Sequence, residues 1–237
     1  MKAQKSRNVH NNKQKETISK QGNLQKWIIK STQESKVYAI IGSRGSGKSC
    51  FAFEFMDWHN KLTNRKLYVY NFPKDDLLPD YIQNVNDLNN LEKGSVVLID
   101  ESGIEFNQFT FNSKKSIELA NMIKIARHND LSIIFIAQNG ANLTKDVRRL
   151  IDCYILKNPS FSQRFDEIPL IKKMYQNCFM LFTTETQKRK GYYIAEIGEM
   201  GFSDVPSFWN ENISKAYSNP KEPTNISKWI NAIKQKV

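Results

Sequence analysis

The sequence predicts an α/β fold in which a mostly parallel central sheet is flanked by helices, with a β-hairpin and short helices toward the C-terminus. Short segments rich in β-branched residues are apolar at nearly every position, as strands buried on both faces are. Segments with helical periodicity lie between them, and this alternation is typical of parallel strands joined by crossovers. A glycine-rich turn links the first strong strand to the first strong helix.

Seven segments of five to seven residues have the apolar, β-branched character of strands. They are residues 36–42, 67–71, 95–100, 132–138, 152–156, 178–184 and 192–198. Four segments between them have helical periodicity, and they are residues 48–61, 114–129, 142–150 and 165–177. The last two strands flank a polar segment, residues 185–191, and this arrangement predicts that they form an antiparallel hairpin.

Composition excludes several classes of protein. Hydrophobic residues make up 40% of the 237 residues, which is enough for a sizeable core and excludes global disorder. No stretch of 18 apolar residues is present, so we do not expect a membrane-spanning protein. The polar N-terminus lacks the apolar segment of a signal peptide, so we do not expect secretion. Three cysteines, Cys50, Cys153 and Cys178, are too few for a disulfide framework or a zinc site.

The formal net charge of +11 lies at the two ends of the chain. Residues 1–30 carry eight basic residues and one acidic residue, and residues 214–237 carry five and one. The body, residues 31–213, has 22 residues of each sign and is neutral. Basic ends attract polyanions such as nucleic acid, although basic tails that are only solvated are also common. Any contact between the body and nucleic acid must therefore depend on local loops.

A complete phosphate-binding motif, G-x-x-x-x-G-K-[ST], lies between the first predicted strand and the first predicted helix. Its glycines let the backbone wrap around phosphate groups, and the helix N-terminus adds partial positive charge. We expect Lys48 to neutralise the β- and γ-phosphates of ATP and Ser49 to ligate Mg²⁺. The residues expected to bind nucleotide are Gly42, Ser43, Arg44, Gly45, Ser46, Gly47, Lys48, Ser49 and Cys50.

The predicted strand at residues 95–100 brings two carboxylates, Asp100 and Glu101, to the carboxyl edge of the sheet. We expect Asp100 to hold Mg²⁺ opposite the phosphate loop. Glu101 is suited to orient and deprotonate the attacking water, although a carboxylate there can also cap the loop. The spacing from Lys48 leaves room for one further strand, residues 67–71, and predicts that the two motif strands are neighbours.

Gln138 ends the next apolar strand, where an amide can hydrogen-bond the γ-phosphate or the attacking water, or can simply be solvated. Arg127 lies at the end of the preceding predicted helix. The helix dipole explains an arginine there, and so does a role as an arginine finger that reaches the γ-phosphate of a neighbouring subunit. Arg148 and Arg149 are alternative candidates for this finger, or for a contact with DNA.

In these three motifs the chain resembles the HerA–FtsK superfamily of ATP-driven DNA translocases, and most nearly its compact viral genome-packaging ATPases. The resemblance covers residues 36–156, about half of the chain, and rests on GSRGSGKS at 42–49, VVLIDE at 96–101 and ARHNDLSIIFIAQN at 126–139. It implies a P-loop NTPase fold, Arg127 acting in trans, and Gln138 acting as a sensor of hydrolysis. The Arg-His pair is also similar to that of Zot-like morphogenesis proteins of filamentous phages, which usually carry a membrane segment.

The resemblance further implies an ATPase that uses ATP and Mg²⁺ to move double-stranded DNA through a homo-oligomeric ring, usually a hexamer. A viral genome-packaging motor is the first hypothesis, with a capsid or membrane protein as a further partner and a place in the host cytoplasm or on the virion. A nucleotide-gated assembly or secretion ATPase, or a plasmid or cellular DNA-transfer motor, is the alternative. A small-molecule kinase is disfavoured because the sequence shows no evident arginine-rich lid.

We expect three parts along the chain: a flexible basic arm at residues 1–23, a P-loop ATPase domain at 24–200, and a C-terminal extension at 201–237. Lys188, Arg189 and Lys190 are the internal candidates for DNA binding, because a basic hairpin tip could project into a channel. A solvated hairpin tip explains the same residues equally well.

Overall fold

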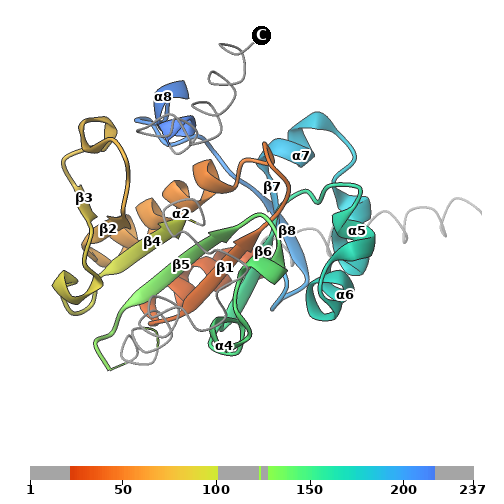
Figure 1. Ribbon diagram of the computed structural model, residues 1–237, viewed down its shortest axis with the longest axis horizontal. Coiled ribbons are helices and arrows are strands. Elements are labelled where there is room, and N and C mark those ends of the chain that lie inside the picture. Colours follow the sequence, from red (N-terminus) through yellow and green to blue (C-terminus); the bar gives the residue numbers. More distant parts are fainter. Residues whose placement is uncertain (1–21, 101–122, 124–127, 217–237) are drawn as a thin grey trace, which may run out of the picture.

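The computed structural model describes residues 22–100, 123 and 128–216, which form an eight-stranded sheet with helices on both faces (Figure 1). The strand order is β3-β2-β4-β5-β1-β6-β7-β8; neighbours from β3 to β6 are parallel, and β7 and β8 are antiparallel. The strands are β1 (Val37–Ile41), β2 (Leu67–Tyr70), β3 (Ile82–Val85), β4 (Val96–Asp100), β5 (Ser132–Ala137), β6 (Cys153–Leu156), β7 (Gly191–Ile194) and β8 (Glu199–Phe202). This confirms the predicted mostly parallel α/β sheet with a C-terminal hairpin.

One long helix and several short ones surround this sheet. They are residues 22–33, α2 (Lys48–Thr63), α4 (Lys145–Arg148), α5 (Gln163–Asp166), α6 (Pro169–Cys178), α7 (Glu185–Lys190) and α8 (Glu211–Ser214). The predicted helix at 114–129 lies almost wholly outside the described residues. Within the described ranges, no helix combines the length and the apolar character that crossing a bilayer requires.

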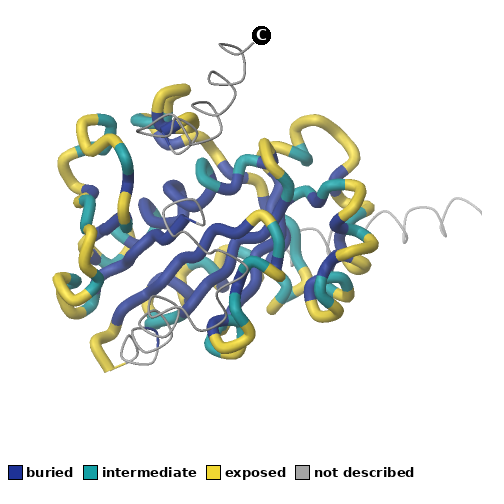
Figure 2. The backbone as a smooth tube through the Cα atoms, viewed as in Figure 1, coloured by how far each residue is buried: buried dark blue, intermediate teal, exposed yellow. Residues whose placement is uncertain are grey.

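Alternate side chains of the central strands enter two separate apolar clusters, so the sheet is buried on both faces. Figure 2 shows the central strands as buried. On β1, Tyr38 and Ile40 face the cluster that contains α2, whereas Ala39 and Ile41 face the cluster that contains α4 and α6. Most residues of helix α2 up to His59 are buried, and its phenylalanines pack against each other and against Trp27 of the helix at 22–33.

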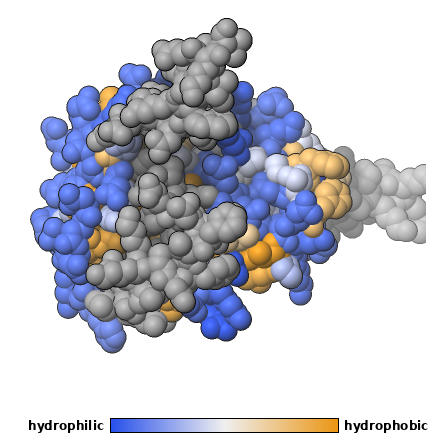
Figure 3. Space-filling view, viewed as in Figure 1, coloured by the Kyte–Doolittle hydropathy of each residue, from blue (hydrophilic) through white to orange (hydrophobic). Residues whose placement is uncertain are grey.

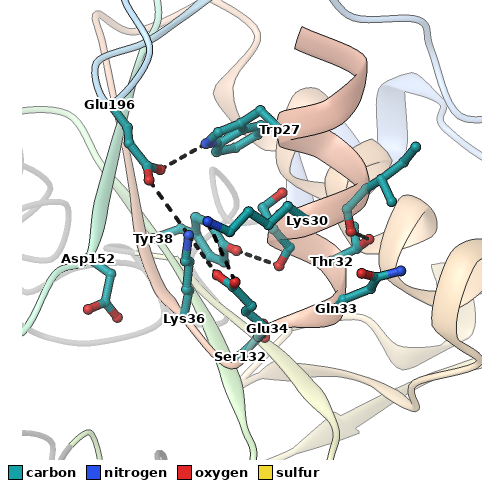
Figure 4. Close-up of polar contacts among 12 residues, drawn as sticks. Trp27, Lys30, Thr32, Gln33, Glu34, Lys36, Tyr38, Ser132, Asp152 and Glu196 are labelled. Carbon is teal, nitrogen blue, oxygen red and sulfur yellow. Dashed lines mark hydrogen bonds and ion pairs between the residues drawn. The ribbon is translucent and has the colours of Figure 1, made fainter. Parts of the chain in front are cut away.

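A chain of polar contacts joins the helix at 22–33 to the sheet (Figure 4). The indole Nε1 of Trp27 donates to the carboxylate of Glu196 at 2.8 Å. The ammonium of Lys36 lies 3.7 Å from Glu196 and 3.0 Å from Glu34. The hydroxyl of Tyr38 donates to the carbonyl of Ser31 at 2.7 Å. These contacts fix the described N-terminal helix on β1 and on the turn between β7 and β8.

The predicted strand at 178–184 is wrong. Tyr175, Cys178 and Phe182 are buried, and their spacing of three and four residues is helical. The segment accordingly completes α6 and continues into a 3-10 turn, Phe179–Leu181.

The hairpin also has different boundaries from the predicted ones. Residues 185–190 are helix α7, whose start is fixed by a capping box between Thr184 and Gln187. The hairpin instead consists of β7 and β8, which turn at Gly198 with a φ of 69°. The pattern T-x-x-Q was present in the sequence and predicts a helix start here rather than a loop.

The arrangement of the motif strands corrects another expectation. The strand β1 that carries the phosphate loop and the strand β4 that ends in Asp100 are not neighbours, because β5 pairs with both of them. Two strands rather than one, β2 and β3, separate the motifs along the chain. The short β3 lies at the edge of the sheet and has the sequence IQNV. Two of these residues are polar, so the segment lacks the apolar run from which strands are predicted.

The predicted division of the chain stays a prediction. The arm at 1–23 lies outside the described residues except for its last two positions, which begin the helix at 22–33. Strand β8 crosses the predicted boundary after residue 200, and Ile213 and Ala216 are buried in the same apolar cluster as α2.

We predict that Glu54 on α2 makes stability fall as pH rises. Its side chain is 8% exposed and accepts a hydrogen bond from the main-chain N–H of Asp204 at 2.9 Å. Burial raises the pKa of Glu54 from about 4.5 to about 7. The folded state therefore binds the Glu54 proton more tightly than the unfolded state does. The stability that protonated Glu54 contributes is fully present below about pH 4.5 and is lost as pH rises through about 7.

Urea unfolding of the wild type and of Glu54→Gln at pH values across this window tests the prediction. The variant should lose the part of the pH slope that Glu54 contributes. Glu185→Gln, a change to an exposed carboxylate on α7, is the control and should keep the slope. If the free energy of unfolding changed with pH by the same slope in the wild type and in Glu54→Gln, the prediction would be contradicted.

Candidate nucleotide-binding site

The phosphate loop adopts a conformation that depends on its glycines. Gly45 and Gly47 have φ values of 77° and 79°, in the left-handed region that side chains with a Cβ rarely adopt. The main-chain N–H of Ser46 donates to the carbonyl of Ser43 at 3.2 Å, which closes the loop. Helix α2 then begins at Lys48 with Gly47 as its N-cap, without a side-chain cap and without an acidic residue in its first turn.

This local structure suits an anion. The first N–H groups of a helix lack intrahelical partners, and the helix dipole adds positive charge at the same place. The hydroxyl of Ser46 is buried and has no hydrogen-bond partner among the described residues, so a phosphate oxygen could satisfy it.

The remaining residues of the predicted loop lie around this turn. The ammonium of Lys48, which is 8% exposed, donates to the carbonyl of Ser43 at 2.9 Å and so lies across the loop. Arg44 is exposed, whereas Ser49 and Cys50 are half-buried in the first turn of α2. Burial raises the pKa of the Cys50 thiol to about 11, so the thiol is protonated at neutral pH and Cys50 acts as a packing residue.

Three strand ends meet at one edge of the sheet. Asp100 on β4 is in register with Ile136 on β5, and Ile41 on β1 is in register with Ala137. Because these strands are parallel, Asp100, Gln138 and the start of the phosphate loop share the carboxyl edge, with Gln138 directly after the middle strand. Asp100 is 8% exposed, and Gln138 is exposed. Glu101 and Arg127 lie outside the described residues.

Helices α5 and α6 hold the turn that follows β5. The side-chain amide of Gln163 donates to the main-chain carbonyl of Gln138. The carboxylate of Glu167, which is buried, accepts from the main-chain N–H of Gly140 at 3.0 Å. Arg148 donates to the carbonyls of Gly140 and Leu143, at 3.1 and 2.6 Å. The backbone that positions Gln138 is therefore fixed from several sides.

The two alternative arginines differ in their surroundings. Arg148 is bound to carbonyls of its own subunit. Arg149 is exposed and lies 3.6 Å from Asp146.

The three basic candidates for DNA binding are not at a hairpin tip. They form the last turn of α7. Lys188 pairs with Glu185 at 2.8 Å, whereas Arg189 and Lys190 are exposed. The Lys190 carbonyl accepts hydrogen bonds from both the main-chain N–H and the hydroxyl of Ser203, which anchors the end of α7 to the segment after β8.

Lys157 belongs to the surroundings of the phosphate loop and was not predicted. It directly follows β6, its side chain is 0% exposed, and its ammonium donates to the carbonyl of Arg189 at 3.0 Å. In the sequence it follows the apolar run CYIL, a position from which a lysine usually reaches solvent. Only the pairing of β6 with β1 shows that this strand end lies under the phosphate loop.

The parallel sheet, the glycine-dependent loop and the uncapped start of α2 together define the chain as a P-loop NTPase. A family model for zonular occludens toxin (Zot) matches residues 59–158, which run from the end of α2 to just beyond β6. A comparison with curated proteins finds no match.

Two solved structures support the same fold. The genome packaging NTPase B204 from Sulfolobus turreted icosahedral virus 2 aligns with a TM-score of 0.51 and 14% identity, over 73% of this chain and 97% of that chain. EccC from Thermomonospora curvata (ATPases 2 and 3) aligns with a TM-score of 0.52 and 7% identity, over 79% of this chain and 41% of that chain. At the level of the fold, the expected resemblance to viral packaging ATPases is confirmed.

We predict that Gly47→Ala destabilises the protein more than Gly45→Ala. Both changes place a Cβ at a left-handed φ, which costs about 1–2 kcal/mol. Among the described residues, a Cβ at Gly45 would meet nothing within 4 Å, whereas a Cβ at Gly47 would collide with the main-chain carbonyl of Arg189. The difference between the two variants in free energy of unfolding, measured with urea, gives the cost of this collision, because the backbone strain is common to both. Equal free energies of unfolding would show that α7 does not pack on the loop.

Proposed function

We propose that this chain is an ATP-hydrolysing DNA translocase. The observation that carries the proposal is the strand order β4-β5-β1, which supports placing Asp100, Gln138 and the phosphate loop around one bound nucleotide. ATP fits the loop because the glycine turn, the uncapped helix start and the buried Ser46 hydroxyl all offer donors to phosphate oxygens.

The proposed roles of residues 42–50, Asp100 and Gln138 rest on this placement, whereas those of Glu101 and Arg127 rest on the sequence motifs. Residues 42–50 would bind the phosphates, with the ammonium of Lys48 moving from the Ser43 carbonyl to the β- and γ-phosphates. The Ser49 hydroxyl and the Asp100 carboxylate are hard oxygen ligands and would hold Mg²⁺, which stabilises negative charge on the phosphates when bound. We assign Glu101 as general base, Gln138 as the residue that senses the γ-phosphate, and Arg127 as the arginine supplied to a neighbouring subunit.

We further propose that the chain acts as a homo-oligomeric ring, a hexamer, around double-stranded DNA. Five exposed apolar side chains cluster on and beside α5 and α6, and Figure 3 shows apolar surface at this edge of the molecule. They are Phe161, Phe165, Leu170, Met180 and Leu181. Several apolar side chains exposed at one edge are typical of protein–protein contacts, which supports an oligomer or a capsid or membrane partner.

Contact with DNA would come from the basic chain ends and from local basic groups on the otherwise neutral body. The two basic chain ends and the exposed Arg189 and Lys190 are the candidates, with Lys188 partly neutralised by Glu185. A genome-packaging role, in the host cytoplasm or on the virion, is supported by the structural likeness to a viral genome packaging NTPase.

A second candidate is an assembly or secretion ATPase in which nucleotide sets a conformation and hydrolysis resets it. The match of residues 59–158 to the Zot family model favours this candidate. Both candidates need ATP hydrolysis, but only the first needs directional movement along DNA.

We predict that Glu101→Gln binds ATP but turns it over about 10²- to 10⁴-fold more slowly, because a general base contributes about that factor. Lys48→Ala is the contrasting variant and should lose ATP binding itself. Steady-state ATPase assays together with binding of a fluorescent ATP analogue separate the two defects. Normal turnover by Glu101→Gln would remove Glu101 from its assigned role.

We predict that the protein displaces a triplex-forming strand from linear duplex DNA when ATP is hydrolysed, and that duplex DNA stimulates its ATPase activity. Glu101→Gln should bind DNA and ATP without displacing the third strand. ATP hydrolysis without displacement under the same conditions would reject the translocase and support the assembly ATPase.

A further inference from the structure

The side chain of Lys157 is an unusual feature of the core. Lysine is almost never fully buried unless its ammonium is paired, yet Lys157 is 0% exposed. Burial lowers the pKa of its ammonium to about 8, although the neighbouring Cys50 and Glu54 oppose this shift. The fold therefore keeps a cation where an apolar side chain would be easier to bury, which points to a use for the ammonium.

Lys157 extends along the phosphate loop from its first glycine to its last. Its main-chain N–H donates to the carbonyl of Ile41 at 2.7 Å, directly before the loop. A Cβ at Gly42 would lie 2.7 Å from the Cβ of Lys157, and a Cβ at Gly47 would lie 3.6 Å from its Nζ. The centroid of the Phe51 ring lies 5.5 Å from the same Nζ.

The ammonium also joins the loop to α7. It donates at 3.0 Å to the carbonyl of Arg189, in the last turn of that helix. The last carbonyls of a helix lack intrahelical partners and carry partial negative charge, so a buried cation is well matched to them. The same carbonyl is the atom that a Cβ at Gly47 would meet. The side chain of Lys157 thus starts at the end of β6, lies beside the phosphate loop and reaches the end of α7.

We propose that Lys157 is a positioning residue that couples the phosphate loop to α7, so that nucleotide binding changes the order of the helix end that carries Arg189 and Lys190. This rests on the proposed binding of nucleotide by the loop. Because Arg189 and Lys190 are exposed, the coupling would transmit the nucleotide state to a basic surface suited to a polyanion.

Hydrogen exchange of the full chain, with and without a non-hydrolysable ATP analogue, tests the coupling. In the wild type we expect the analogue to slow exchange both in the phosphate loop and at residues 185–191. In Lys157→Met, with the analogue at saturation, the loop should still be protected while α7 no longer responds. Phe51→Leu is the packing control, and its α7 should still respond.

A response of α7 in Lys157→Met equal to that of the wild type would overturn the proposal, and so would equal effects of Lys157→Met and Phe51→Leu. Failure of the proposed nucleotide site itself gives a different result, since the wild-type loop would then show no protection at all.

A surface variant keeps the test decisive if Lys157→Met does not fold. Thr184→Ala removes the exposed N-cap of α7 without touching the core. Through the coupling it should weaken binding of a fluorescent ATP analogue about 5-fold or more. Asn210→Ala, which removes the N-cap of α8, is the matched control and should leave the affinity unchanged. Wild-type affinity in Thr184→Ala would overturn the proposal.

Discussion

The pairing of β5 with both β1 and β4 is the constraint on which the rest of the structure depends. Parallel strands end at the same edge of a sheet, so this pairing brings the phosphate loop, the Asp100 carboxylate and Gln138 to the same edge. Each strand of the three is buried on both faces, which leaves little freedom to shift register. Burial of the apolar strand residues thereby fixes the relative positions of the polar groups at the ends of these strands.

The phosphate loop is supported by its neighbours as well as by its own glycines. The N–H and hydroxyl of Ser43 both donate to the carbonyl of Asn158, at 3.0 and 2.9 Å. Lys157, one residue earlier, runs beside the loop and reaches α7. The chain just after β6 therefore holds the start of the loop through Asn158 and lies beside its last glycine through Lys157.

Much of the fold and of the site was predictable from local sequence. The phosphate loop and Asp100 were predictable because each lies next to a strand and obeys a short motif whose geometry is local. The position of β5 between the motif strands was not, because strand order depends on non-local pairing that no short segment encodes. Lys157 was missed for the same reason: its burial is a consequence of β6 pairing with β1.

The remaining errors had local causes. The segment at 178–184 is as apolar as a strand, and only the spacing of Tyr175, Cys178 and Phe182 shows that it continues a helix. The capping box that begins α7 can be recognised in the sequence, but the run of basic residues after it suggested a loop instead.

A structure of the full chain with Mg²⁺ and a non-hydrolysable ATP analogue tests the central claim most directly. The account predicts the phosphates within the loop at 42–49, the metal held by Ser49 and Asp100, and the side chain of Gln138 within hydrogen-bonding distance of the γ-phosphate. A nucleotide bound elsewhere, or a γ-phosphate out of reach of both Asp100 and Gln138, would contradict it.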